Sequence, residues 1–185
     1  MREQVAELLT NKKDLLTVTY FKLQKLFEKK YGKNTVVLME IGTFFEVYEV
    51  NNEKEKIGKA KEIAELLNIQ LTRKNKSILE NSKENPIMAG VPAISFEKHL
   101  ARIIAEQKYT IAIIKQKGTP PNVSRYLDVI VSPGTNFDFV VEQDDNFITS
   151  IVIDQIRGNY LIGCSAIDVT TAKCYYNEVF GTHED

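Results

Sequence analysis

Residues 35–50 read Thr-Val-Val-Leu-Met-Glu-Ile-Gly-Thr-Phe-Phe-Glu-Val-Tyr-Glu-Val, and they give the clearest indication of the fold. It is rich in the β-branched, aromatic and other apolar side chains that suit strands. Gly42 and Thr43 interrupt the run, and two asparagines end it at residues 51–52. The pattern predicts two strands, residues 35–41 and 44–50, that pair as a hairpin.

Helical and strand-like segments alternate around this hairpin. Apolar spacing predicts helices over residues 15–31, ended by Gly32, over 57–67, and over 96–107 with Ser95 as N-cap. Further strands are expected at 69–73, 87–91, 109–115 and 126–131, and residues 74–85 form a polar loop. This order predicts an α/β domain over residues 1–132, with a mixed β-sheet and packed helices.

The character of the chain changes after Pro133. Residues 133–146 are acidic and rich in turn formers, which indicates a linker. Three strands are then predicted at 147–154, 159–168 and 173–180. Three antiparallel strands leave one face uncovered, so residues 147–185 are interpreted as the truncated start of a second domain.

Charge divides the chain in the same place. Residues 1–135 contain 22 Lys and Arg against 16 Asp and Glu, whereas the remaining 50 residues contain 2 against 9. This asymmetry suggests different partners for the two regions, although charge runs usually mark solvated faces. Two cysteines, Cys164 and Cys174, are too few for a disulfide framework or a zinc site and are expected to be buried or half-buried. The sequence contains no apolar run long enough to span a bilayer.

Phe44 and Glu46 form the candidate site. In a strand, Phe44, Glu46 and Tyr48 share one face, while Phe45 and Val47 take the other. An aromatic side chain at the start of a strand could serve as a wedge that intercalates between DNA base steps. The alternative is that Phe44 belongs to the core and Glu46 is a solvated charge at its rim.

Five co-linear segments, which include this motif, resemble the MutS family of DNA mismatch-repair proteins. Residues 42–48 are similar to its Gly-Asp-Phe-Tyr-Glu-Leu-Phe segment, whose Phe-X-Glu motif reads the mismatch. The other similar segments are residues 64–73, 86–92, 109–116 and 129–135. Residues 160–171 also resemble the opening strands of the MutS connector domain, which has a ribonuclease-H-like fold. The chain departs from the family pattern at Thr43, at Ala93-Ile94 and at Lys115, which leaves its lesion preference open.

The resemblance implies a function and a set of residues. Residues 1–132 would be a mismatch-recognition domain that inserts Phe44 beside a mispaired or unpaired base, with Glu46 contacting the displaced base. Arg73, Lys74 and Lys76 would form a basic loop suited to phosphate contacts. Met88 aligns near the wedge, although a buried methionine is the simpler interpretation. The expected partner is double-stranded DNA with mismatches or small loops.

The same resemblance sets expectations for the rest of the protein. The full-length protein is expected to be a homodimeric ATPase that uses ATP and Mg²⁺ and works with a MutL-type partner. No Gly-x-x-x-x-Gly-Lys-Ser/Thr motif occurs in this sequence, so these residues are expected to hold no cofactor and to catalyse no reaction. The expected location is the cytoplasm, in association with the nucleoid and without membrane contact; an organellar or viral origin is the alternative.

Two other functions compete with mismatch recognition. A MutS paralogue could bind branched DNA without mismatch specificity, although the presence of both Phe44 and Glu46 favours a mismatch reader. A ribonuclease-H-like nuclease would need Asp154, Asp168 and Glu178 to converge on metal ions. His99 and His183 do not make a catalytic set.

Overall fold

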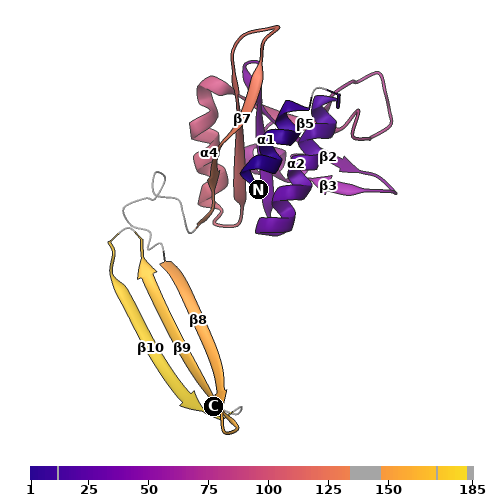
Figure 1. The fold of residues 1–185 in the computed structure, drawn as a ribbon. Coiled ribbons are helices and arrows are strands. Elements are labelled where there is room, and N and C mark those ends of the chain that lie inside the picture. Colours follow the sequence, from indigo (N-terminus) through magenta and orange to yellow (C-terminus); the bar gives the residue numbers. More distant parts are fainter. Residues whose placement is uncertain (12, 134–146, 170, 183–185) are drawn as a thin grey trace. The chain divides into compact units, whose positions relative to one another are not determined.

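The computed structural model describes residues 1–11, 13–133, 147–169 and 171–182 (Figure 1). It contains two compact units, Met1–Ser132 and Pro133–Asp185. The predicted linker lies outside the described residues from residue 134 onward. No helix of the described residues is long and apolar enough to cross a membrane.

The first unit is built on a seven-stranded mixed sheet. β1 (Thr35–Ile41) and β2 (Phe44–Asn51) form the predicted antiparallel hairpin, and β1 also pairs in parallel with β6. The other strands are β3 (Lys56–Gly58), β4 (Thr72–Arg73), β5 (Ile87–Pro92), β6 (Thr110–Lys117) and β7 (Ser124–Val131). The strand order is β4-β5-β2-β1-β6-β7, and β3 pairs with β2. The predicted α/β fold class is confirmed.

Helices cover both faces of this sheet. They are α1 (Arg2–Thr10), α2 (Leu16–Tyr31), α3 (Ala60–Leu67) and α4 (Phe96–Ala105), the last preceded by a 3₁₀ turn, Ala93–Ser95. On one face, α2 buries Tyr20, Phe21 and Phe27 in a core that includes Met39 and Tyr48. On the other face, Phe45 stacks on Phe96 of α4 with ring centroids 3.6 Å apart. Alternate side chains of β2 therefore pack into the core on one face of the sheet or the other.

Three local predictions are wrong or incomplete. Ile57 does not belong to a helix: it lies in β3, where it pairs with Val50, and the helix begins only after Gly58. The position of Ile57 fits the apolar spacing of a helix as well as that of a strand, and the glycine that follows it, Gly58, favours an interruption between the two elements. Ser95 precedes α4 as predicted, but its hydroxyl donates to the carbonyl of Pro92 and does not cap the helix. Helix α1 was not predicted.

The second unit is an antiparallel sheet of three strands with the order β10-β9-β8. These are β8 (Phe147–Ile156), β9 (Asn159–Asp168) and β10 (Cys174–Gly181), close to the predicted ranges. Large apolar side chains are exposed on both faces, with Ile151 and Ile153 on one and Val152 on the other. One uncovered face was predicted, so this prediction understated the exposure. Cys164 is half-buried, but Cys174 is exposed, contrary to expectation.

Candidate nucleic-acid interface

Phe44 lies at the surface of the first unit, at the first position of β2. Its side chain is 44% exposed, whereas the next residue, Phe45, is 4% exposed. Strand alternation explains the contrast because neighbouring side chains point to opposite faces. Phe44 is therefore an exposed aromatic residue and not a member of the core, which removes the alternative interpretation of this residue.

The turn that carries Phe44 is fixed by neighbours on both sides. The Gln116 side chain of β6 accepts a hydrogen bond from the Gly42 amide (3.1 Å) and donates one to the Gly42 carbonyl (2.7 Å). On the other side, the Ala93 amide donates to the Thr43 carbonyl at 2.8 Å. Four strands in a row, β5, β2, β1 and β6, therefore hold the base of the exposed aromatic side chain.

Exposure rises in steps along this face of β2. Tyr48 is fully buried, and its ring meets that of Tyr20 from α2 edge to face at 4.8 Å. The Glu46 side chain is 12% exposed. Phe44 stands at the open end of the series. Glu46 lies opposite Gly90 of β5, which has no side chain to cover it.

Two donors hold the Glu46 carboxylate. The Tyr48 hydroxyl donates a short hydrogen bond to Oε2, and the Lys74 ammonium approaches the same oxygen at 3.1 Å. The Lys74 ammonium also lies 3.1 Å from the Tyr48 hydroxyl. Burial, followed by the charge of Glu46, raises the pKa of Tyr48. The phenol thus keeps its proton and acts as a donor.

The predicted basic loop does not act as one cluster. Lys74 points onto Glu46, while the Arg73 guanidinium donates to the carbonyls of Ile78 and Leu79 within its own loop. Lys76 is exposed. The buried Asn85 side chain fixes the loop through hydrogen bonds to the carbonyls of Ile78 and Glu80 at 3.0 and 3.1 Å.

Met88 lies opposite Tyr48 in the β2–β5 register. It is half-buried and packs against the core beneath α2. Packing is therefore its observed role.

Three residues that contact the Phe44–Glu46 strand or the turn before it, or that act on it through their charge, were not predicted to belong to the site. Tyr48 was expected only to pack, but strand alternation already placed its side chain on the face of Glu46. Gln116 lies within a segment that carried the family resemblance. Arg125 of β7 is half-buried, and its Nε lies 3.4 Å from the Glu40 carbonyl oxygen. Its charge interacts electrostatically with Tyr48 and Glu46. No local sequence signal marks Arg125, because β7 reaches this face only through the sheet order.

The three carboxylates considered for a nuclease do not converge. Asp154 pairs with Leu161 and Glu178 pairs with Gly163, whereas Asp168 lies seven positions beyond Leu161 on β9. At a rise of about 3.3 Å per residue, this separation is about 23 Å, and Asp168 projects from the opposite face. Among the described residues, no group of three His, Cys, Asp or Glu side chains could hold a metal ion. The second unit thus lacks the geometry of a two-metal site in its described part.

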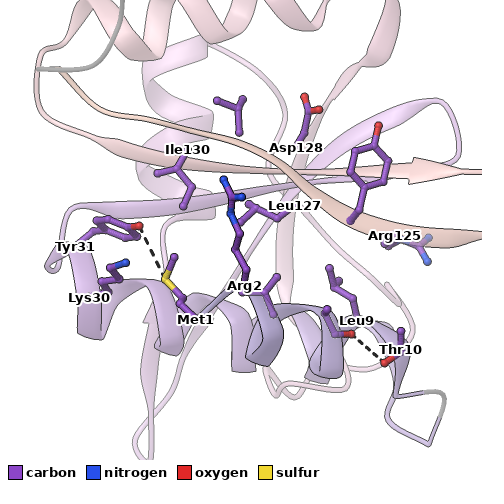
Figure 2. A pocket seen from close by; sticks show the side chains of 14 residues that line it. Met1, Arg2, Leu9, Thr10, Lys30, Tyr31, Arg125, Leu127, Asp128 and Ile130 are labelled. Carbon is purple, nitrogen blue, oxygen red and sulfur yellow. Dashed lines mark hydrogen bonds between the residues drawn. The ribbon is translucent and has the colours of Figure 1, made fainter.

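A groove lies between α1 and β7, and Phe44 is not among the residues that line it (Figure 2). Its volume is about 890 Å³, and Arg2 extends across it from α1 while Leu127 and Ile130 form part of the β7 side. Neither Phe44 nor Glu46 lines it. Arg125 belongs to both places, but the groove is not part of the arrangement around Glu46.

Comparison with known proteins identifies the family. The model of MutS domain I matches residues 19–140. A mutS homolog of Acanthamoeba polyphaga mimivirus is 29% identical over 182 residues, 95% of this chain. The DNA mismatch repair protein MutS of Chlorobium phaeobacteroides is 29% identical over 156 residues (81% of this chain), and that of Halothermothrix orenii is 28% identical over 157 residues (82%).

The first unit is thus a mixed α/β domain that carries a Phe-X-Glu motif at the start of β2, with its phenylalanine exposed. The family model covers well over half of the chain, and the chain belongs to the MutS family. It spans 16% of the length of each of these three relatives.

Proposed function

We propose that the first unit recognises mispaired or unpaired bases in duplex DNA. The observation that supports this most directly is the exposed Phe44 on a turn tied down on both sides, with the Glu46 carboxylate two residues along the same face. An exposed aromatic side chain on a rigid support suits insertion into a base step. Family membership supplies the second support.

Phe44 would be the wedge. Opening a base step costs a few kcal/mol in matched DNA and less where the bases pair and stack poorly. The protein would then respond to how easily the DNA deforms at that step and not to one base sequence. Such a reader accepts many different lesions, as mismatch repair requires.

Glu46 would supply discrimination. A carboxylate near phosphates is repelled, so it adds nothing to general affinity. In the minor groove, an A·T pair offers only acceptors, which an ionised carboxylate cannot satisfy. Glu46 would therefore penalise matched DNA and accept a hydrogen bond from a displaced base.

The surrounding residues would have lesser roles. Lys76, exposed on the loop after β4, is suited to a phosphate contact, and Arg73 would support the loop through its carbonyl contacts. Lys74 and Met88 would line the site from its β4–β5 side. We propose that the second unit begins a connector domain.

For the full-length protein, we propose the family's wider activity. It would bind mismatches or small loops as a homodimer, use ATP and Mg²⁺ through residues outside this chain, and act with a MutL-type partner.

Fluorescence anisotropy with labelled duplexes tests the proposal. The full-length protein and its Phe44→Ala variant are titrated, at low salt, with matched DNA and with DNA carrying a G·T mismatch or one unpaired T. Wild type should prefer the mismatched duplexes, and Phe44→Ala should lose that preference at a cost of about 1–3 kcal/mol, the value of one base stacked on an aromatic ring. Phe45→Leu, a buried residue one position along, serves as the control and should keep the preference.

Equal binding of all duplexes by wild type and Phe44→Ala would contradict the proposal. The family relation would then reflect ancestry alone. A four-way junction included in the same titration tests the branched-DNA alternative, which predicts tight junction binding without dependence on Phe44.

A further inference from the structure

We infer that Lys74 is a positioning residue for Glu46: together with Tyr48, it holds the carboxylate through Oε2 and leaves Oε1 as the acceptor for a displaced base. This inference rests on the proposed function, because it names what sets the selectivity of the same site. It assigns to Lys74 a role other than the phosphate contact that its place in a basic loop suggests.

The geometry is specific to one oxygen. Both donors, the Tyr48 hydroxyl and the Lys74 ammonium, end on Oε2 of Glu46. Within the described part of the chain, no hydrogen bond reaches Oε1. The two donors are also 3.1 Å from each other, which closes a three-membered network. A carboxylate held in this way presents one oxygen to the protein and one to the outside.

The Lys74 side chain is positioned along its length. Lys74 follows β4, and its amide donates to the Pro86 carbonyl at 3.0 Å, which fixes the start of the side chain. Its ammonium meets the hydroxyl end of the Tyr48 ring, 3.1 Å from the oxygen and 5.4 Å from the ring centre. Backbone, hydroxyl and carboxylate contacts together direct the end of this lysine onto Glu46, although its side chain stays 37% exposed.

Charge explains why the carboxylate needs this lysine. A carboxylate that is 12% exposed loses most of its hydration, and this cost is offset only by charged or hydrogen-bonding partners. The titratable and charged groups that face Glu46 are Lys74 after β4, Tyr48 on β2 with Tyr20 of α2 behind it, and Arg125 of β7. Lys74 is the cation in direct contact, at 3.1 Å.

The arrangement selects the kind of base that Glu46 can recognise. An ionised carboxylate accepts hydrogen bonds and donates none. With Oε2 already occupied, Oε1 can receive an N–H from the Watson–Crick edge of a displaced thymine or guanine. A matched A·T pair presents only acceptors in the minor groove, which Oε1 cannot satisfy. Lys74 thus contributes to the preference for mismatched DNA by fixing the carboxylate, without touching the DNA.

The test compares two neighbouring lysines in the full-length protein. Binding to matched and G·T duplexes is measured for wild type, Lys74→Met, Lys74→Arg and the matched control Lys76→Met, at several salt concentrations. Lys74→Met should reduce the preference for G·T over matched DNA roughly tenfold, the worth of one charge-assisted hydrogen bond. Lys74→Arg, which keeps the cation, should restore the preference.

Lys76→Met should behave differently. It should weaken binding to both duplexes by the same factor and lower the slope of log affinity against log salt by about one phosphate contact, with the preference unchanged. If Lys74→Met gives that result as well, Lys74 is a phosphate contact and the inference is wrong. A Lys74→Met variant that keeps the wild-type preference for G·T over matched DNA also overturns it. A wild-type protein that prefers no duplex refutes the proposed function itself, and this result is seen before any lysine variant is compared.

Discussion

The two units of this chain are built from strands of similar apolar content, yet they differ in what covers those strands. In the seven-stranded sheet, helices lie on both faces and residues such as Val37, Met39 and Ile114 are fully buried. In the three-stranded sheet, Ile151, Val152 and Ile153 in the middle of β8 are 62–64% exposed. Strands rich in apolar residues are stabilised when those residues are buried. In the first unit, its own helices bury them; in the described part of the second unit, they stay exposed.

This contrast indicates which unit can carry an exposed binding residue without losing stability. A covered sheet can support an exposed aromatic side chain because its own stability does not depend on that residue. A sheet with apolar residues on both faces is typical of strands that become buried on both sides. The first unit is thus suited to carry a site, while the described part of the second unit is suited to further packing.

The largest expected effect comes from removing the same aromatic group in each unit of the 185-residue chain. Phe27→Ala deletes a fully buried ring beneath the seven-stranded sheet and should lower the free energy of unfolding by about 3–5 kcal/mol. Phe180→Ala in β10, where the ring is 59% exposed, should cost at most about 1 kcal/mol. Hydrogen exchange measured separately for each unit checks both values. Equal losses would show that the β8–β10 sheet is packed as well as the first.

A pair of glycines gives the next effect. Gly58 and Gly158 have nearly the same left-handed φ, +86° and +87°. A Cβ at Gly58 would lie 2.1 Å from the Tyr48 carbonyl oxygen, whereas one at Gly158 would have no atom within 4 Å. Gly58→Ala should therefore cost about 2–4 kcal/mol, from strain and a backbone clash. Gly158→Ala should cost only the strain, about 1–2 kcal/mol. Urea unfolding of the two variants measures the difference, and equal costs would mean that the β3 turn yields without penalty.

The smallest effect is a pH-dependent one in the first unit. Partial burial acts to raise the pKa of Glu62 on α3, but hydrogen bonds from Lys108 and Tyr109 outweigh it and bring the pKa from 4.5 down to about 2. A lowered pKa in the folded state stabilises the fold above the unfolded value and loses this contribution as pH falls from about 4.5 to about 2. Because the side chain is 37% exposed, the contribution should not exceed about 1 kcal/mol.

Urea unfolding at pH 6 and pH 3 tests this contribution with two variants. Glu62→Gln should lose less stability than wild type between the two pH values. Glu65→Gln is the matched control on the same helix, because its ion pair with Lys61, at 4.0 Å, is exposed to solvent. If Glu62→Gln and wild type lose the same amount, the contacts from Lys108 and Tyr109 do not stabilise the folded state.

Much of the fold could be predicted because strand periodicity and turn residues are local signals. The β1–β2 hairpin and helix α2 were predicted to within one residue at each end. Ile57 was misassigned because a single apolar residue before a glycine satisfies both periods. Helix α1 is nine residues long and contributes Val5 as its buried residue, so its apolar spacing is too short to show a clear helical period.

The site was predictable where it depends on one strand and not where it depends on the sheet. Alternation placed Phe44, Glu46 and Tyr48 on one face, as observed. That Lys74 would turn inward, or that Gln116 would hold Gly42, depends on pairings between residues 28 and 74 positions apart. The strand order brings these residues together, and no local pattern encodes it.

The hydrogen bonds around the Gly42–Thr43 turn have a mechanical consequence. An inserted side chain opens a base step only when the protein segment that carries it deforms less than the DNA does. Because Gln116 of β6 and Ala93, the residue after β5, anchor the turn on either side, a force on the Phe44 ring would be shared across the sheet and would not bend a single turn. Under the proposed function, the DNA step is the more compliant of the two bodies. The deformation of the protein would then stay small, and the free energy of binding would depend mainly on how easily the base step deforms.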